Sequence, residues 1–241
     1  MLFFHLSLRI SVNGTTRTRT QGIDYYTSDE AVAASAEKPY FVSLSGKTLS
    51  DNLTMLKIVS NVKGVDAIEL NVACPNVIGH PIIGYDFDQF QDVLESLASH
   101  PDVGKKPLGI KLPPYLDFQH FKKVAEMVRC SYLLSSNSSS HTYSNFIQIN
   151  KCDFVRYVAC INTMGNALVV DADSEQPLIR PKGGFGGLSG PSVKYTALAN
   201  VKKLRELLRK DIDVIGVGGV RTLVVVSGVS HNRIVTFYSN T

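Results

Sequence analysis

The feature that most constrains the fold is a regular alternation of short apolar runs with longer amphipathic segments, which begins at about residue 39. Short apolar runs are typical of strands, and apolar residues three and four apart are typical of helices. Alternation through five strands predicts a parallel sheet covered by helices. The expected strands cover 40–46, 66–72, 108–112, 154–161 and 213–217, and the expected helices cover 48–62, 86–97, 117–129 and 196–208.

Three of the expected helices begin with residues that favour a helix start. Thr48 is followed three residues later by Asp51, which resembles a capping box. Asp86 and Asp117 each precede an apolar pattern of helical spacing and can cap its first turn.

Polar residues or glycines follow each of the five expected strands. Parallel strands end at one edge of a sheet, where a (β/α)8 barrel places its active site. An open doubly wound sheet would use the same edge, but the early GxGxxG and later acidic residue of a dinucleotide fold are missing. The pattern therefore predicts an α/β fold, either an open sheet or a (β/α)8 barrel of which about five of eight βα units are recognisable. The strand-end residues include Ser43, Ser45, Gly46, Asn71, Cys74, Asn76, Lys111, Asn162, Thr163, Gly218 and Gly219.

Composition and charge argue against several classes of function. The 241 residues, 44% hydrophobic and 19% charged, suffice for one barrel or two small domains. A net charge of +4 without a dense Lys/Arg stripe argues against nucleic acid, and no apolar run approaches the ~20 residues of a membrane span. The four cysteines form no CxxC pair and no zinc-like spacing with histidine, so we expect no metal, reduced thiols and a cytoplasmic location.

Two segments interrupt the alternation. Residues 135–150 are rich in Ser and Asn, which is typical of a solvated loop, and we expect a low-complexity insertion over 131–152. Residues 1–21 contain no clear βα unit. We therefore expect an irregular segment over 1–21 and a single partial barrel domain over 22–241.

The run from Glu69 to Asn76 combines a strand end with reactive groups. Its second half places the Cys74 thiol between two asparagine carboxamides and beside Pro75. A thiol can move a proton, and carboxamides can hold a planar polar molecule by its amide edges. A lone cysteine is more often a buried core residue, and that interpretation stays open.

Three other strand-end features have both a structural and a functional interpretation. Lys111 ends an apolar strand, where a charge is costly unless it is paired, but a lysine there can also reach solvent. The glycine-rich run 181–190 and the pair Gly218–Gly219 can cradle a phosphate with backbone N–H groups, or can form surface turns. Asn162 and Asn166 bracket a turn, which asparagine favours for local reasons alone.

Together these residues resemble the dihydroorotate dehydrogenases, and within them the cytosolic, fumarate-reducing class. The resemblance runs from about Gly22 to Val220, interrupted by the Ser-rich stretch, and its motifs occur in order and at family-like spacing. The matching pieces are 43–46 (SLSG), 69–76 (ELNVACPN), 111–115 (KLPPY), 160–166 (CINTMGN), 184–188 (GFGGL), 196–200 (TALAN) and 216–220 (GVGGV).

The resemblance implies an α/β fold of the (β/α)8 TIM-barrel type, incomplete in this chain, that carries FMN and forms a homodimer where the barrel is complete. The family oxidises dihydroorotate to orotate in pyrimidine biosynthesis, and the class that this chain resembles uses fumarate as electron acceptor. Cys74 matches the catalytic base, and cysteine there, rather than the serine of the membrane-bound class, argues for the soluble class. The positions that match substrate-binding groups are Asn71, Asn76, Asn162 and Thr163, where Thr163 replaces the usual serine. The positions that match FMN-binding groups are Ser45, Asn71, Lys111, Ile161, Gly190, Gly218 and Gly219.

The chain departs from the family pattern at both ends. No counterpart of the family's first, second or eighth strand is recognised, and residues 223–229 are a candidate substitute strand. These ends and the Ser-rich stretch resemble a truncated or misassembled reading of a longer gene. The alternatives are a non-catalytic barrel fragment or another FMN barrel, such as dihydropyrimidine dehydrogenase or tRNA dihydrouridine synthase.

Overall fold

The structure, a computed structural model, describes residues 8–10, 22–34, 38–73, 81–129, 152–179, 181–219 and 234–236. The strands are β1 (Leu8–Ile10), β2 (Phe41–Leu44), β3 (Ala67–Asn71), β4 (Leu108–Lys111), β5 (Val155–Cys160), β6 (Met164–Leu168), β7 (Phe185–Leu188), β8 (Asp213–Gly216) and β9 (Ile234–Thr236). The helices are α1 (Gly22–Tyr26), α2 (Asp29–Ala33), α3 (Leu49–Ser60), α4 (Phe87–Ala98), α5 (Phe118–Arg129) and α6 (Lys194–Leu207).

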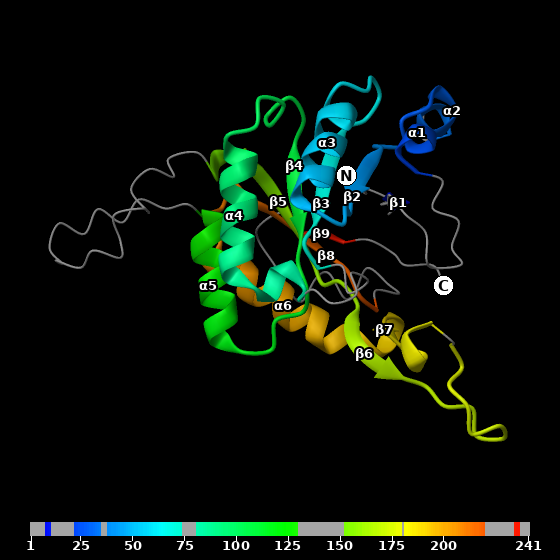
Figure 1. The fold of residues 1–241 in the computed structure, drawn as a ribbon. Helices are drawn as coiled ribbons and strands as arrows, with labels where there is room; N and C mark the ends of the chain where they lie inside the picture. Colours follow the sequence, from blue (N-terminus) through cyan, green and yellow to red (C-terminus); the bar gives the residue numbers. More distant parts are fainter. Residues whose placement is uncertain are drawn as a thin grey trace, which may run out of the picture.

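Seven of these strands form one parallel sheet in the order β1-β2-β3-β4-β5-β8-β9, and β6 and β7 form a separate antiparallel pair (Figure 1). The order of the seven strands follows the chain and never reverses. Right-handed crossovers that all move in one direction put their helices on one face of a sheet, whereas a doubly wound sheet reverses and carries helices on both faces. The expected α/β fold of barrel type, incomplete, is therefore confirmed, and within the described residues β1 and β9 are the two edges of the sheet.

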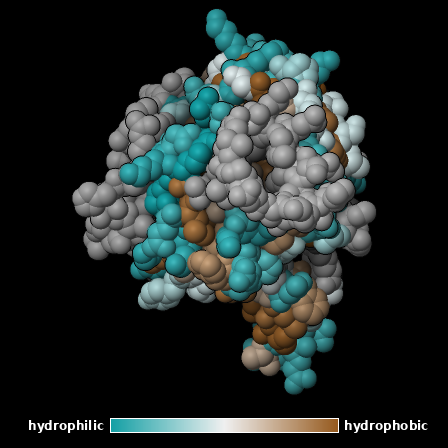
Figure 2. Space-filling view, turned by 90° about the vertical axis from the view of Figure 1, so that its left-hand side faces the viewer, coloured by the Kyte–Doolittle hydropathy of each residue, from teal (hydrophilic) through white to brown (hydrophobic). Residues whose placement is uncertain are grey.

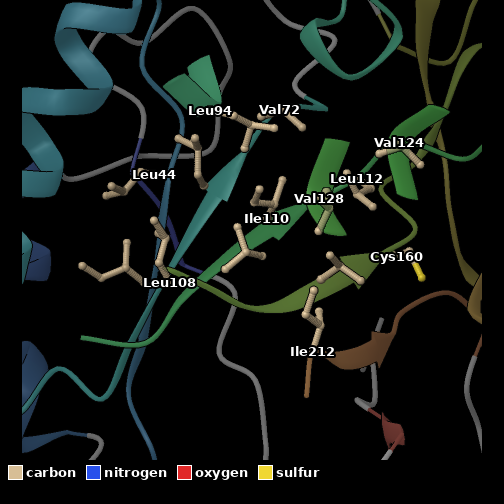
Figure 3. Close-up of a cluster of buried hydrophobic side chains, with 14 of the residues drawn as sticks. Leu44, Val72, Leu94, Leu108, Ile110, Leu112, Val124, Val128, Cys160 and Ile212 are labelled. Carbon is tan, nitrogen blue, oxygen red and sulfur yellow. The ribbon is translucent and has the colours of Figure 1, made fainter. Parts of the chain in front are cut away.

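The hydrophobic core lies between the sheet and its helices. Every second strand residue points to the helices, and apolar residues three and four apart on each helix face back towards them. Figure 3 shows Leu44, Ile110 and Cys160, from three different strands, gathered with Leu94 of α4 and Val124 of α5. All five side chains are buried.

The helix starts expected from the sequence are confirmed. Thr48 and Asp51 form a complete capping box at α3, in which each side chain accepts a hydrogen bond from the other residue's backbone N–H. Asp86 caps α4 by accepting a hydrogen bond from Gln89 N at 3.1 Å. Asp117 accepts one from His120 N at 3.0 Å at the start of α5. These bonds satisfy N–H groups that the first turn of a helix leaves without an internal partner.

Two expectations are corrected. Residues 1–21 do contribute a strand, since β1 pairs in parallel with β2, and the short β9 extends the other edge beside β8. The glycine-rich run 181–190 does not form a single phosphate loop: residues 185–188 are strand β7, which pairs with β6. Three-residue strands show no sequence period, and glycines obscure the alternation that marks a strand.

Several expectations fall outside the described residues. These are the candidate substitute strand over 223–229 and nearly all of the insertion over 131–152, of which only 152 belongs to the described part. The division into 1–21 and 22–241 stays a proposal. Among the described residues, no helix is long and apolar enough to cross a membrane.

Candidate functional site

The sheet has an inner face, opposite the helices, that carries the candidate site. Ala67, Tyr157, Ala159 and Ile215 form a small apolar cluster on it, separate from the main core, and Phe41 packs against them. Because strand side chains alternate between faces, the residues in register with this cluster also belong to the inner face.

One row of the inner face contains two of the predicted site residues. Asn71 of β3 pairs with Lys111 of β4, Lys111 pairs with Ala159 of β5, and Ala159 pairs with Ile215 of β8. The row lies at the carboxyl ends of the strands, as the sequence predicted. Asn71 and Lys111 are only 7% and 8% exposed, so nearly all of each side chain is buried. The two interpretations of Lys111, as a functional charge and as a lysine whose end reaches solvent, both stay predictions.

A hydrogen-bond network joins Asn71 to Asn162, although 91 positions separate them in the chain. Asn162 Nδ2 donates to Asn71 Oδ1 at 3.1 Å and to the Ala73 carbonyl at 3.0 Å. Asn71 Oδ1 also accepts from Ala73 N at 3.0 Å. Two facing carboxamides thus lie at the edge of the inner face, and each carries both donor and acceptor atoms for the amide edge of a planar ligand.

Thr163 continues this network towards the β6–β7 pair. Its backbone N–H donates to Asn162 Oδ1 at 2.9 Å, which fixes the peptide between the two residues. Its side chain, which is partly exposed, lies directly against Gly187 of β7. Asn162 therefore makes tertiary bonds that a simple turn-forming asparagine does not require.

Tyr157 covers part of the inner face one row further from the carboxyl edge than Asn71 and Lys111. Its ring occupies the space over Gly109, its cross-strand partner, where a Cβ would collide with the ring carbons. Its hydroxyl donates to the Ile68 carbonyl at 3.0 Å, and its ring lies 5.7 Å from that of Phe41. Burial, with the nearby charge of Glu69, raises the pKa of the Tyr157 phenol well above its usual value, so this group remains a neutral donor.

Glu69 places a carboxylate in the same row as Tyr157. It is 1% exposed and in register with Ser43, whose hydroxyl donates to Glu69 Oε1 at 3.1 Å. Glu69 and Lys111 place an acidic and a basic side chain, both buried, on the inner-face side of the neighbouring strands β3 and β4.

Two glycine-containing loops meet beside β5 and β8. A Cβ on Gly218 would lie 3.6 Å from Ile161 Cγ1, and a Cβ on Gly219 would lie 2.8 Å from the Gly190 carbonyl. Gly190, Gly218 and Gly219 have φ of 78°, 127° and 65°, a region that favours glycine. Among the described residues, nothing would lie within 4 Å of a Cβ on Gly190. Within this part of the chain the backbone is therefore open at Gly190, which begins the 3-10 turn Gly190–Val193 that precedes α6.

The structure therefore brings together most of the predicted site. Ser45 is buried and follows β2 at the same edge, but it has no described contact with the others. Cys74 and Asn76 lie outside the described residues, so the position of the candidate base stays a prediction. Three residues had no predicted role: Glu69 and Tyr157 of the inner face, for which strand alternation was an available signal, and Gly187 of β7.

Cys160 has the environment of a core cysteine. It is fully buried among the helix-facing residues, and burial raises the pKa of its thiol to about 12, although the charge of Lys111 lowers it in part. Such a thiol is neutral at physiological pH and does not act as a base there.

Comparison with known proteins places this site in a family. The model of the family described as "Dihydroorotate dehydrogenase" matches residues 17–155 and 139–224. "Dihydroorotate dehydrogenase (fumarate)" of Saccharomyces mikatae is 38% identical over 209 residues, which cover 84% of this chain and 57% of that protein. "Probable dihydroorotate dehydrogenase A (fumarate)" of Enterococcus faecalis is 39% identical over 202 residues, which cover 83% and 57%. The chain spans little more than half the length of these curated relatives.

Proposed function

We propose, because this chain belongs to the dihydroorotate dehydrogenase family, that its inner-face edge binds FMN and dihydroorotate and supports oxidation of dihydroorotate to orotate, with fumarate as the final electron acceptor. The observation that carries the proposal is the pair of carboxamides on Asn71 and Asn162, next to buried Lys111 at the carboxyl edge of adjacent strands. This reaction would belong to pyrimidine biosynthesis.

The substrate would be held by amide-edge hydrogen bonds. Dihydroorotate is a six-membered ring in which N–H and C=O groups alternate along one planar side, and the ring carries a carboxylate. Asn71 and Asn162 offer a donor and an acceptor each, and Thr163 offers a hydroxyl. Asn76, assigned by the family resemblance, would add a further carboxamide. In the structure as described, Asn162 Nδ2 donates to Asn71 Oδ1, so a ligand that uses these two atoms would have to replace that bond with bonds of its own.

FMN fits the remaining residues of this edge. The open backbone at Gly190 and the close approach of Gly218 and Gly219 suit a phosphate, which binds to backbone N–H groups near a helix start. Ser45, Asn71, Lys111 and Ile161 would hold the flavin, and the Lys111 ammonium would stabilise negative charge on it. When bound, FMN supplies a two-electron acceptor for the hydride of the substrate.

The chain's own chemical contribution would be removal of a proton. We assign this to the Cys74 thiolate, which would take the proton from carbon 5 of the ring, by resemblance to the family. The Asn71–Asn162 network holds the peptide groups of Ala73, the residue that immediately precedes Cys74. It would thereby fix the chain at the point where the segment bearing the base begins.

An anaerobic experiment tests the proposal. Protein reconstituted with FMN is mixed with dihydroorotate, and the visible flavin absorbance is followed. We expect loss of absorbance, its recovery on addition of fumarate, and a large decrease of the first rate in Cys74→Ala. Lys111→Met should impair the reaction, whereas Lys202→Met, an exposed lysine on α6, should not. Folded, FMN-loaded protein with unchanged absorbance would contradict the proposal.

The alternative proposal is a non-catalytic barrel fragment that does not bind FMN. A fragment that lacks part of the flavin site would fold cooperatively without FMN-dependent stabilisation. The same reconstitution therefore separates the two proposals.

We also propose a homodimer, formed through the β6–β7 pair and the segment between its strands. Figure 2 shows a hydrophobic patch on the lobe that protrudes at the bottom, which is this segment in Figure 1. Large apolar patches on a surface mark interaction sites, and a second copy of the chain would offer a patch of identical character. The exposed apolar residues here are Leu168, Val169, Val170, Leu178, Ile179, Phe185 and Leu188.

Analytical ultracentrifugation tests the homodimer. Leu178→Asp should yield a monomer, while Leu116→Asp, at an even more exposed leucine outside this segment, should leave a dimer. A monomeric wild-type protein would contradict this proposal. A cytoplasmic location, proposed from the same family resemblance, is tested by cell fractionation.

A further inference from the structure

Two different constraints favour glycine in the run 183–187, one from the backbone conformation and one from the available space. Gly183 and Gly184 have φ of 66° and 93°, which a residue with a side chain rarely adopts. Gly187 has no such backbone constraint. A Cβ there would lie 2.6 Å from Thr163 Cβ and closer still to Thr163 Oγ1. Gly187 is therefore required by the space that Thr163 occupies.

The contact restricts a side chain whose backbone is already fixed. The Thr163 N–H is held by Asn162 Oδ1, and Met164, the next residue, pairs with Leu188, the residue after Gly187. What remains free is the χ1 rotation of Thr163. A β-branched side chain has few favourable rotamers, and the Gly187 backbone packed against it restricts them further.

We propose that Gly187 is a positioning residue that sets the direction of the Thr163 hydroxyl at the substrate site. It acts through Thr163 and does not itself touch the substrate. The inference rests on the proposed function, because it assumes that the Thr163 hydroxyl binds the pyrimidine. Through the side chain of Thr163, which occupies the space beside Gly187, it would connect β7 to the Asn162–Asn71 network.

The test compares two alanine variants of the same antiparallel pair. Gly187→Ala adds a methyl group against Thr163, whereas Gly165→Ala adds one where no described residue lies within 4 Å. Orotate and FMN dissociation constants and the thermal midpoint are measured for the FMN-loaded protein. Gly187→Ala should weaken orotate binding about tenfold, the effect of forcing one side chain off its rotamer, and leave FMN affinity unchanged. Gly165→Ala should change neither constant.

A second background separates positioning from general damage. In Thr163→Gly, which removes the atoms that the new methyl group would meet, Gly187→Ala should cause no further loss of orotate affinity and a smaller loss of thermal stability. If Gly187→Ala alone does not fold, the double variant should fold again. The inference is overturned if Gly187→Ala matches Gly165→Ala, or if it weakens orotate binding equally in both backgrounds. A wild-type protein that binds FMN but not orotate would instead contradict the proposed function.

Discussion

The Asn162 side-chain amide donates to the Asn71 side-chain carbonyl at 3.1 Å, and this bond ties the end of β5 to the end of β3. The same amide nitrogen bonds the Ala73 carbonyl. One carboxamide thus holds two strand ends and the chain that leads to residue 74.

Replacing Asn162 by aspartate tests this network. Asn162→Asp keeps the shape but turns a donor into a charged acceptor that faces Asn71 Oδ1 and the Ala73 carbonyl. We expect a loss of about 2–4 kcal/mol in the free energy of unfolding, measured by urea denaturation. Asn166→Asp is the control, because Asn166 is exposed and its φ of 60° suits aspartate as well. Equal urea midpoints for the two variants would contradict the network.

The Gly109–Tyr157 pair gives a second prediction. Gly109→Ala forces a methyl group into the Tyr157 ring and should destabilise the fold by about 1–3 kcal/mol. Tyr157→Phe, which keeps the ring and removes the bond to the Ile68 carbonyl, should cost about 1 kcal/mol. In a Tyr157→Ala background, Gly109→Ala should cost clearly less. Additive losses in that double variant would refute the contact.

Asn200 of α6 provides a third test, outside the site. Its carboxamide accepts from Tyr115 N and donates to the Tyr115 carbonyl, both at 2.9 Å, and it is 1% exposed. Asn200→Ala leaves two buried backbone groups without these partners and should cost about 2–4 kcal/mol in chemical unfolding. Lys202→Ala, at an exposed position of the same helix, should cost almost nothing.

The buried Cys160 thiol should make the free energy of unfolding depend on pH in the alkaline range. Its thiol pKa is raised from 9.0 to about 12 by burial. The unfolded chain therefore releases this proton at lower pH than the native chain. The resulting stability is fully present below pH 9.0 and is lost as pH rises towards 12. Cys160→Ala should flatten this part of the stability profile in urea titrations above pH 9.0, and an unchanged slope would be evidence against the assignment.

Local sequence patterns predicted the strands and helices that pack on the core, because period and capping are local signals. Thr48 with Asp51 marked the start of α3 to within one residue, and the five expected strands correspond to β2, β3, β4, β5 and β8. Alignment of parallel strand ends also predicted that Asn71 and Lys111 would share an edge.

The missed features depend on contacts between distant segments. β1 and β9 exist because neighbouring strands offer hydrogen bonds to three residues each, and no period is visible over that length. The relation of Tyr157 to Gly109 requires the register of β4 and β5. The role of Gly187 appears only once β7 lies against Thr163.

The most direct test of the central claim, that these strand ends form a flavin site, is an equilibrium titration of the purified chain with FMN, followed by flavin fluorescence and by the thermal midpoint. We expect saturable, stoichiometric binding that raises the thermal midpoint and is weakened in Lys111→Met but not in Lys202→Met. A chain that unfolds cooperatively but shows no saturable FMN binding and no rise in thermal midpoint would contradict it.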